Sequence, residues 1–366
     1  MRQERLMRDE SIKSTDLFKF DYFKCLRSEF AKSECSICID LCPEEAMVFD
    51  RAKLTLDTSR CTACAACMGS CPTEALISEA FDPNRFVIEF SKEKNRKISC
   101  KENVPCIAAL SSEHLIAMAL RKDSEIVCDL AHCKECSLNG GNRVLETIEK
   151  IIEEAERFLQ ISGSTKRIEC QRELLDDAPK AARRGLLKRV ANIVGDMNED
   201  DTMAELASLG GEKQPLRRIL LKNSLKLEAQ NLSQETAVGA DFSFVVNKRI
   251  DESTCTNCQE CAMFCPTEAL TILQDNTGIV FQMGKCIACS ICNEVCKPGS
   301  ILNDGAFDPV EFAFDRMELL VKHKLEICEE CKVAFAYRGG EKVCDRCRDF
   351  KENFSDLFTM AKDIEC

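Results

Sequence analysis

The amino-acid sequence predicts an α+β protein of several domains, and three observations lead to this prediction. The chain has 27 cysteines among 366 residues and contains no tryptophan. Most of these cysteines fall into four runs, which form two pairs at 25–71 and 255–296. The heptapeptide AFDPNRF at 80–86 follows the first pair, and AFDPVEF at 306–312 follows the second. The chain therefore contains an internal duplication.

Three of the four runs have the spacing C-x2-C-x2-C-x3-C, and the first is stretched, with nine residues between Cys25 and Cys35 where two are usual. The runs are Cys25, Cys35, Cys38 and Cys42; Cys61, Cys64, Cys67 and Cys71; Cys255, Cys258, Cys261 and Cys265; and Cys286, Cys289, Cys292 and Cys296. Two such runs in tandem are typical of modules that bind two 4Fe–4S clusters. Zinc knuckles use two C-x2-C pairs instead, and a disulfide framework needs an oxidising compartment, to which no signal here directs the chain.

In such modules the fourth cysteine of each run ligates the cluster of the other run. The predicted ligand sets are therefore Cys25, Cys35, Cys38 and Cys71; Cys61, Cys64, Cys67 and Cys42; Cys255, Cys258, Cys261 and Cys296; and Cys286, Cys289, Cys292 and Cys265. The stretch before Cys35 makes Cys25 the least regular member. Apolar segments at 47–56 and 270–281 predict β-hairpins. The Cys-Pro-Thr-Glu steps at Pro72 and Pro266 predict the starts of short helices.

On these motifs, regions 1–95 and 246–315 each resemble a bacterial 2×4Fe–4S ferredoxin. The resemblance covers about a third of the chain and implies four clusters that carry single electrons. Each module is too short to bury a large core, so cluster ligation would supply part of its stability.

Residues 96–165 predict a different domain, in which strands and helices alternate in an α/β pattern. Cys106, Cys133, Cys136 and the Gly141-Asn142 step resemble the delta subunit of methyl-viologen-reducing hydrogenase. In that family the cysteines hold an iron–sulfur cluster, so the resemblance implies an additional cluster here. The early cysteine pair of the family is missing, and Cys100 could replace part of it. Buried thiols without a ligand are the alternative interpretation.

Residues 166–245 predict a helical linker region, with basic amphipathic segments at 181–190 and 215–221. A basic amphipathic helix can lie on a membrane or in a partner groove. We favour the simpler expectation that these helices are solvated on one face and pack their apolar stripe on the protein itself.

Residues 316–366 predict a zinc ribbon. Two C-x2-C pairs, twelve residues apart, have the spacing of a two-knuckle site, and its ligands would be Cys328, Cys331, Cys344 and Cys347. Four thiolates close a tetrahedron around zinc, so the site would be structural. Rubredoxin-type iron is the competing metal.

Several motifs are missing from the sequence. No G-x-G-x-x-G follows a predicted strand, no Walker A lysine occurs, and there is no C-x-x-C-H haem attachment motif. The formal net charge of −12 disfavours nucleic acid as a partner. No apolar stretch reaches the roughly 20 residues of a membrane span, and the first residues lack a secretory signal. We therefore expect a cytoplasmic protein that docks on redox enzymes or redox subunits.

The sequence thus predicts an electron-transfer protein or subunit that relays single electrons through about four 4Fe–4S clusters. By analogy, the partner would be an anaerobic redox enzyme of the formate dehydrogenase or hydrogenase type. An iron–sulfur assembly or accessory factor for a metalloenzyme is the alternative. A catalytic role is disfavoured, because complete ligand sets leave no open iron position in the ferredoxin modules.

Overall fold

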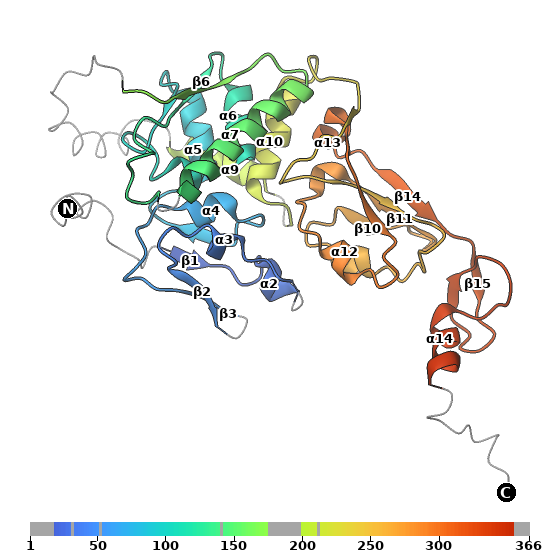
Figure 1. Cartoon of the computed structure of the whole chain (residues 1–366). Helices are drawn as coiled ribbons and strands as arrows, with labels where there is room; N and C mark the ends of the chain where they lie inside the picture. The colour runs from blue at the N-terminus through green and yellow to red at the C-terminus, as the bar shows by residue number, and fades with distance from the viewer. Residues whose placement is uncertain are drawn as a thin grey trace, which may run out of the picture.

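The computed structural model of the protein describes residues 18–30, 33–50, 53–139, 142–174, 199–210 and 213–354. Figure 1 shows the N-terminal module beneath a layer of helices, the C-terminal module beside both, and a small ribbon at the far end. The predicted amphipathic segment at 181–190 lies outside the described residues.

The N-terminal module consists of two antiparallel strand pairs and short helices. Its elements are β1 (Phe18–Phe20), α2 (Leu26–Glu29), α3 (Ile37–Asp40), β2 (Met47–Asp50), β3 (Lys53–Leu56), α4 (Ala66–Ser70) and β4 (Leu76–Ser78). Strand β1 pairs with β4, and β2 pairs with β3. A small core of its own contains Met47, Leu54, Met68 and Leu76. The hairpin predicted at 47–56 is confirmed at its two strands.

The C-terminal module repeats this topology. Its elements are β9 (Asn247–Ile250), α11 (Glu260–Met263), β10 (Leu270–Ile272), β11 (Gly278–Phe281), η5 (Met283–Lys285), α12 (Ile291–Val295), β12 (Ile301–Asp304), β13 (Ala306–Phe307), α13 (Pro309–Phe314) and β14 (Glu318–Lys322). Strand β9 pairs with β12 as β1 pairs with β4, and β10 with β11 as β2 with β3. The second predicted hairpin is therefore confirmed, and β14 adds a third strand to it. Strand β13 pairs with β8 (Ala237–Val238), which precedes the module.

The prediction that helices start at the Cys-Pro steps is wrong. Helix α4 ends at Ser70, directly before the Cys71-Pro72 step, and helix α11 ends at Met263, two residues before the Cys265-Pro266 step. After each Cys-Pro-Thr step the chain turns through Glu74 or Glu268, both with φ +53°, and enters a strand. Proline cannot donate a backbone hydrogen bond and is common just past a helix end, so it marks the end of a helix here.

The duplicated heptapeptide forms the same helix start twice. Asp82 and Asp308 are the N-caps of α5 (Pro83–Lys92) and α13. Each carboxylate accepts a 2.8 Å hydrogen bond from the amide two residues later, at Asn84 or Val310. Proline at the first helical position provides a φ that suits the helix in both copies.

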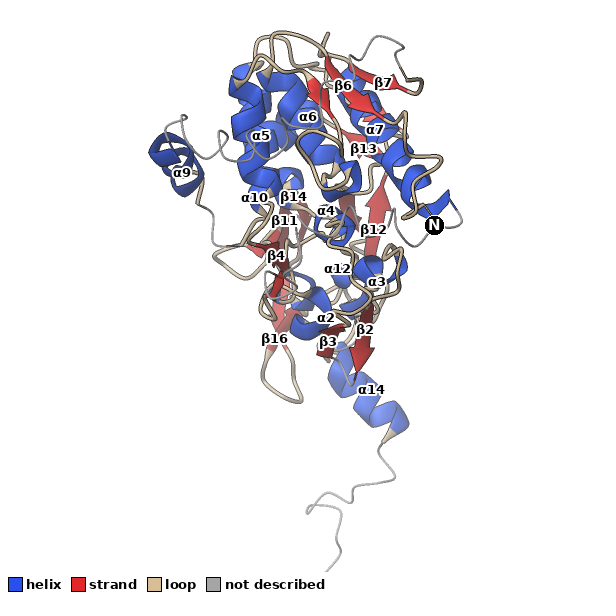
Figure 2. Cartoon of the chain, turned by 90° about the vertical axis from the view of Figure 1, so that its left-hand side faces the viewer, coloured by secondary structure: helices blue, strands red, loops and turns tan. Residues whose placement is uncertain are grey.

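The middle domain is built on a three-stranded parallel sheet. Its elements are β5 (Lys97–Ile98), η2 (Ile107–Ala109), α6 (Ser112–Arg121), β6 (Ile126–Asp129), α7 (Arg143–Ile161) and β7 (Ile168–Gln171). The strand order is β5-β6-β7, and helices α6 and α7 lie against the sheet (Figure 2). Between β5 and α6 the chain forms a single 3₁₀ turn, η2. The sheet also continues through β7, past residue 165.

Region 166–245 contributes α9 (Glu199–Ser208) and α10 (Leu216–Leu227). Helix α10 packs against α6, α5 and α13, so it lies between the middle domain and the C-terminal module. Arg217 and Arg218 on this helix are only 4% and 0% exposed. The expectation that α10 packs on its own protein is confirmed, but the solvated basic face predicted for it is buried at these two residues.

The buried arginines join three regions of the molecule. Arg218 Nε donates to Glu113 Oε1 of α6 at 2.6 Å, and its other nitrogens donate to the carbonyls of Gly284, Cys286 and Phe244. Arg217 forms an ion pair with the same Glu113 and donates to the carbonyl of Gly69 in the N-terminal module at 3.0 Å. Buried charges are stable only when they are paired and hydrogen-bonded, so this network fixes the modules against one another.

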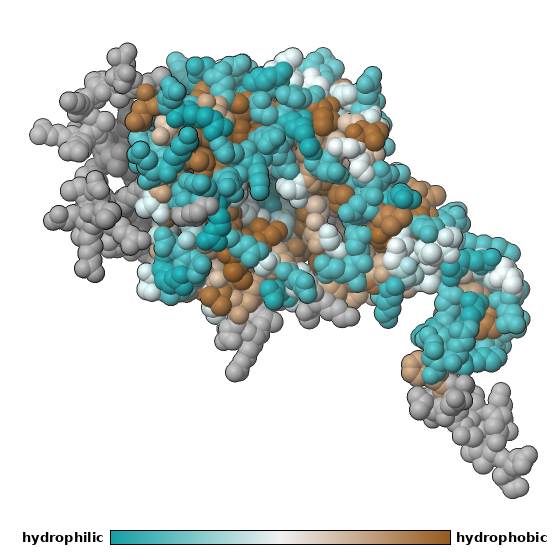
Figure 3. Space-filling view, in the orientation of Figure 1, coloured by the Kyte–Doolittle hydropathy of each residue, from teal (hydrophilic) through white to brown (hydrophobic). Residues whose placement is uncertain are grey.

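The C-terminal ribbon consists of a hairpin, β15 (Leu325–Ile327) with β16 (Ala334–Ala336), followed by α14 (Asp345–Asn353). Figure 3 shows hydrophilic residues over most of this face of the ribbon. Arg338 reaches back and donates to the carbonyl of Ser253 in the C-terminal module at 2.6 Å. The ribbon is therefore joined to the module near its first cysteine run.

Candidate metal centres

The sixteen cysteines of the four runs surround four cavities, four to each. The cavities are lined by Cys25, Cys35, Cys38 and Cys71; by Cys42, Cys61, Cys64 and Cys67; by Cys255, Cys258, Cys261 and Cys296; and by Cys265, Cys286, Cys289 and Cys292. In every case three cysteines come from one run and the fourth from the neighbouring run. The structure therefore brings these residues together in the crosswise grouping that the spacing predicts.

The stretched first run still places Cys25 at its cavity. The nine residues between Cys25 and Cys35 begin with the short helix α2, whose Leu26 side chain is buried in the main core. Cys25 lies beside Cys35, Cys38 and Cys71 as a result. The insertion changes the path of the chain and keeps the four sulfur-bearing residues together.

The backbone of the three regular runs wraps its cavity in one shared conformation. Two residues in each loop have left-handed φ although they are not glycine: Ala63 and Ala65, Asn257 and Gln259, and Ala288 and Ser290. Such residues are strained and gather at functional sites. Turns that include left-handed residues point successive amides inward and form concavities that suit anionic groups, including iron–sulfur clusters.

Backbone amides donate to the sulfurs of the fourth cysteines. Ala46 donates to Cys42 Sγ at 3.2 Å, Ala75 to Cys71 Sγ at 3.3 Å, and Ser300 to Cys296 Sγ at 3.2 Å. These hydrogen bonds stabilise a thiolate over a thiol and help set the potential of an iron–sulfur centre. The donor set of four thiols with aligned amides fits 4Fe–4S clusters at these sites.

Burial keeps several of the metal-free thiols protonated. It raises the pKa of Cys38 to about 12, and repulsion from Cys71, Cys35 and Cys25 adds to the effect. Burial likewise raises the pKa of Cys261 and of Cys289 to about 12. Ligation requires thiolates, so assembly of a centre at these sites releases protons and becomes less favourable as the pH falls.

The two sites within each module are neighbours. Burial raises the pKa of Cys67, and the charges of Cys64 and then Cys38, a residue of the other site, raise it further. In the C-terminal module, burial raises the pKa of Cys261, and Cys292 of the second site is among the charges that add to it. Helices α3 and α4, which carry Cys38 and Cys67, contact each other, as do α11 and α12, which carry Cys261 and Cys292, so the two cavities of each module lie close together.

The middle domain gathers four further cysteines at one edge of its sheet. Cys100 follows β5, Cys106 precedes η2, and Cys133 and Cys136 lie in the turn after β6. The carboxyl ends of neighbouring parallel strands meet at the same edge, which explains the grouping. Burial raises the pKa of Cys106 to about 12, and the charges of Cys64, Cys100 and Cys133 add to this effect. The site is thus adjacent to Cys64 of the N-terminal module.

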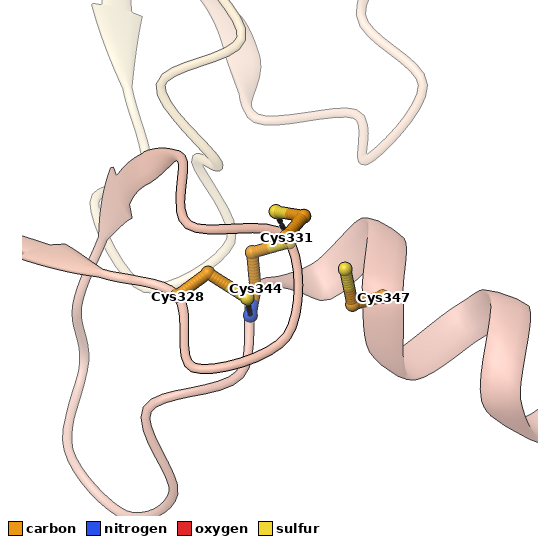
Figure 4. A group of neighbouring side chains, drawn as sticks. All are labelled: Cys328, Cys331, Cys344 and Cys347. Carbon is orange, nitrogen blue, oxygen red and sulfur yellow. Dashed lines mark hydrogen bonds between the residues drawn. The ribbon is translucent and has the colours of Figure 1, made fainter. Parts of the chain in front are cut away.

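The ribbon brings its four cysteines into a tight group (Figure 4). The sulfurs of Cys328, Cys331, Cys344 and Cys347 lie within 4.8 Å of one another, and those of Cys331 and Cys344 are 3.8 Å apart. Zn–S bonds of about 2.3 Å in a tetrahedron place sulfurs about 3.8 Å apart, so the group fits a four-thiolate ion. The amide of Cys344 donates to Cys328 Sγ and lowers the pKa of that thiol, whereas the Cys344 side chain raises the pKa of Cys347 to about 12.

Comparison with known proteins identifies the kind of domain in two places. A family described as a 4Fe-4S dicluster domain matches residues 247–297, and one described as a 4Fe-4S binding domain matches residues 54–77. The chain contains ferredoxin-type 4Fe–4S domains. This supports an iron–sulfur electron-transfer role. No curated protein matches the chain. Among the described residues, no helix combines the length and apolar composition needed to cross a membrane.

Some charged residues at these sites were not found by sequence reasoning. Lys248 lines the cavity of Cys265, Cys286, Cys289 and Cys292, and Arg218 donates to the carbonyl of Cys286. A signal exists for Lys248, because it is two residues before Ile250 on a strand and so shares the inward face with an apolar residue. Arg218 offers no such signal, since its partners come from segments distant in sequence.

Proposed function

We propose that this protein relays single electrons through four 4Fe–4S clusters held at the four crosswise cysteine sites. The observation that supports the proposal most is the grouping itself: each cavity draws three cysteines from one run and one from the other. A 4Fe–4S cluster takes up and releases one electron at a time. Four cysteines complete its iron ligation, so these sites suit transfer better than substrate chemistry.

The placement of the sites supports a continuous route through the chain. The middle-domain site lies beside the N-terminal module through Cys106 and Cys64, and we propose that its four cysteines hold a further iron–sulfur cluster. The rings of Phe30 and Phe264, one from each ferredoxin-type module, are 5.5 Å apart at their centroids. Neither module is separated from the rest by an extended linker in the described residues. Electrons could therefore pass between modules without a docking step.

The C-terminal module offers a place where a redox partner could exchange electrons. Cys258 is exposed, and the neighbouring Met263 and Phe264 side chains are 70% and 45% exposed. We propose that the partner is a redox enzyme or redox subunit that docks here. The net charge of −12 favours a partner with a basic docking surface.

We propose that the ribbon holds structural zinc. Its sulfur spacing fits a closed tetrahedron, and the amide of Cys344 donates to Cys328 Sγ, which stabilises a thiolate there. Zinc has no accessible redox couple, so the ribbon would serve stability and the position of Arg338 rather than transfer.

The proposal is tested by purifying the protein anaerobically and measuring iron, sulfide and EPR spectra. Four clusters correspond to about sixteen iron and sixteen sulfide per chain, and an occupied middle domain would add to both. The reduced protein should show interacting EPR signals, because the paired sites are close. Iron that saturates near eight would contradict the four-cluster relay. Full iron content without reversible reduction would favour the assembly-factor alternative.

A further inference from the structure

One of the four cysteine cavities contains a buried cation. Lys248 lies on β9, is 2% exposed, and lines the cavity of Cys265, Cys286, Cys289 and Cys292. Its ammonium donates to Asn293 Oδ1 and to Asn303 Oδ1, each at 2.6 Å. Asn293 follows the ligand-site Cys292 directly, and its Oδ1 is 3.7 Å from that sulfur. The cation is thus held at the wall of the cavity.

The positive charge of Lys248 has no carboxylate to compensate it within the described residues, since both acceptors are neutral amide oxygens. Arg218, the other cation near this cavity, differs because it is ion-paired with Glu113. A buried charge is costly unless an opposite charge lies nearby. The negative charge available to Lys248 is that of the cavity's cysteines. Burial raises the pKa of Cys292 to about 11, and the nearby Lys248 charge opposes that rise.

The N-terminal module lacks a cation at the equivalent place. Lys248 pairs in register with Asn303, seven residues after Cys296, and Phe18 pairs with Ser78, seven residues after Cys71. Because the two strand pairs are duplicates, Phe18 occupies the position of Lys248.

The cavities match as well. Phe18 lines the cavity of Cys42, Cys61, Cys64 and Cys67, the N-terminal counterpart of the site that Lys248 lines. The next residue, Lys19, also lines this cavity, but its side chain is 64% exposed and forms an ion pair with Glu79, so its charge is compensated. The same position of the same fold therefore carries a phenyl ring in one module and an ammonium in the other.

We propose that Lys248 is a built-in counter-cation that raises the reduction potential of the centre at Cys265, Cys286, Cys289 and Cys292 above that of its N-terminal counterpart. A reduced cluster carries one more negative charge than an oxidised one, so a fixed positive charge beside it favours reduction. Electrons in the relay would then collect in the C-terminal module. The inference rests on the proposed function, because it requires clusters at these sites.

The test is a redox titration followed by EPR on the full-length, cluster-loaded protein. Lys248→Met keeps the length of the side chain and removes its charge. Arg249→Met is the matched control, because Arg249 is the next residue of β9 and is exposed. We expect Lys248→Met to lower the equilibrium constant for reducing one centre at least tenfold, a shift of about 59 mV for one electron. The control should shift it by much less.

Iron and sulfide analysis of the wild-type protein separates the two proposals. Absence of the clusters would contradict the proposed relay. If the clusters are present and Lys248→Met has the same reduction potentials as Arg249→Met, the proposed role of Lys248 as a counter-cation is wrong. A purely structural role for Lys248 would lower the unfolding temperature and leave the potential unchanged, which also overturns the inference. If Lys248→Met does not take up its clusters, Phe18→Lys tests the proposal instead, because a cation at position 18 should raise the reduction potential of the N-terminal centre. An unchanged potential in Phe18→Lys would then reject the proposal.

Discussion

The two ferredoxin-type modules share strand pairing and cysteine grouping but differ in what their equivalent residues contact. Glu74 and Glu268 hold the same place in a Cys-Pro-Thr-Glu step, with the same left-handed φ of +53°. Glu74 accepts from the amides of Leu216 and Arg217 at the start of α10, at 2.7 and 3.3 Å. Glu268 lies at the surface and pairs with Lys213 at 2.7 Å.

This difference shows where the duplicated copies have diverged. The loops of the three regular runs share one conformation, because four thiolates and their amides must surround the same kind of centre. The residues on the outside of each module differ, because they determine its neighbours. Both copies contact the middle domain and α10, the C-terminal copy through Phe307 and Phe312 against Phe158 of α7, and only the C-terminal copy is seen to contact the ribbon in the described residues.

The largest expected effect comes from the fourth cysteines. Cys71→Ser should remove the centre of Cys25, Cys35 and Cys38, and Cys296→Ser that of Cys255, Cys258 and Cys261. Each variant should lose about four iron per chain or convert the centre to a form with three iron atoms. Iron analysis with EPR checks this. If Cys71→Ser instead disturbs the centre of Cys61, Cys64 and Cys67, the crosswise assignment is wrong.

A second variant removes the contact between regions. Arg218→Met leaves Glu113 with one partner and removes donors from three buried carbonyls, so we expect a loss of about 3–5 kcal/mol in the free energy of unfolding. The apparent unfolding midpoint of the loaded protein measures it. Arg249→Met, an exposed charge, should change stability by only about 0.5 kcal/mol. Combining Arg218→Met with Glu113→Gln should recover part of the lost stability. Equal losses of stability in Arg218→Met and Arg249→Met would show that the buried Arg218 contacts do not hold the regions together.

The paired glutamates provide a smaller and more direct comparison. Glu74→Ala removes acceptors from the first amides of α10 and should destabilise the protein by about 1–2 kcal/mol, as loss of a helix cap does. Glu268→Ala removes one exposed ion pair and should cost about 1 kcal/mol or less. The same unfolding assay compares the two. Equal losses of stability in Glu74→Ala and Glu268→Ala would mean that the two glutamates do not differ in their contribution, although their contacts differ.

The smallest effect on the modules is expected from the ribbon. Cys344→Ser should release about one zinc and loosen the last 40 residues or so, since it removes one corner of the thiolate group. The potentials of the clusters should stay unchanged, because zinc has no redox couple. Metal analysis beside the redox titration measures both. Absence of zinc from the wild-type protein, with loss of a redox transition in the variant, would indicate rubredoxin-type iron.

The sequence was most informative where chemistry fixes spacing. The cysteine runs predicted which residues line each cavity, because the reach of a short loop around one centre leaves little freedom. The hairpins at 47–56 and 270–281 were also predicted, because short apolar segments between two cysteine runs favour β-strands. The helix starts at Pro72 and Pro266 were wrong because proline is compatible with either end of a helix, and only the preceding turns decide.

Contacts between distant segments could not be predicted in this way. Arg218 looks like a residue of a solvated basic face, and its burial depends on Glu113, Gly284 and Phe244 from three other segments. Lys248 is similar, because its role depends on pairing with Asn303 and on Asn293 from α12. The family resemblance suggested Cys100 beside Cys106, Cys133 and Cys136, and the parallel strands that end at one edge give the physical reason for this grouping.

Gly69 on α4 carries a consequence for the kinetics of this protein. A methyl group at this position would collide with the backbone of Ala108, Ala109 and Leu110, which begins two residues after Cys106. The backbone of α4, next to the N-terminal cysteine site, therefore lies directly against the backbone that follows Cys106 of the middle-domain site, with no side chain between them. Electron passage across this seam would need no diffusive encounter, so its rate should be insensitive to solvent viscosity and ionic strength, whereas exchange with an outside partner would depend on both.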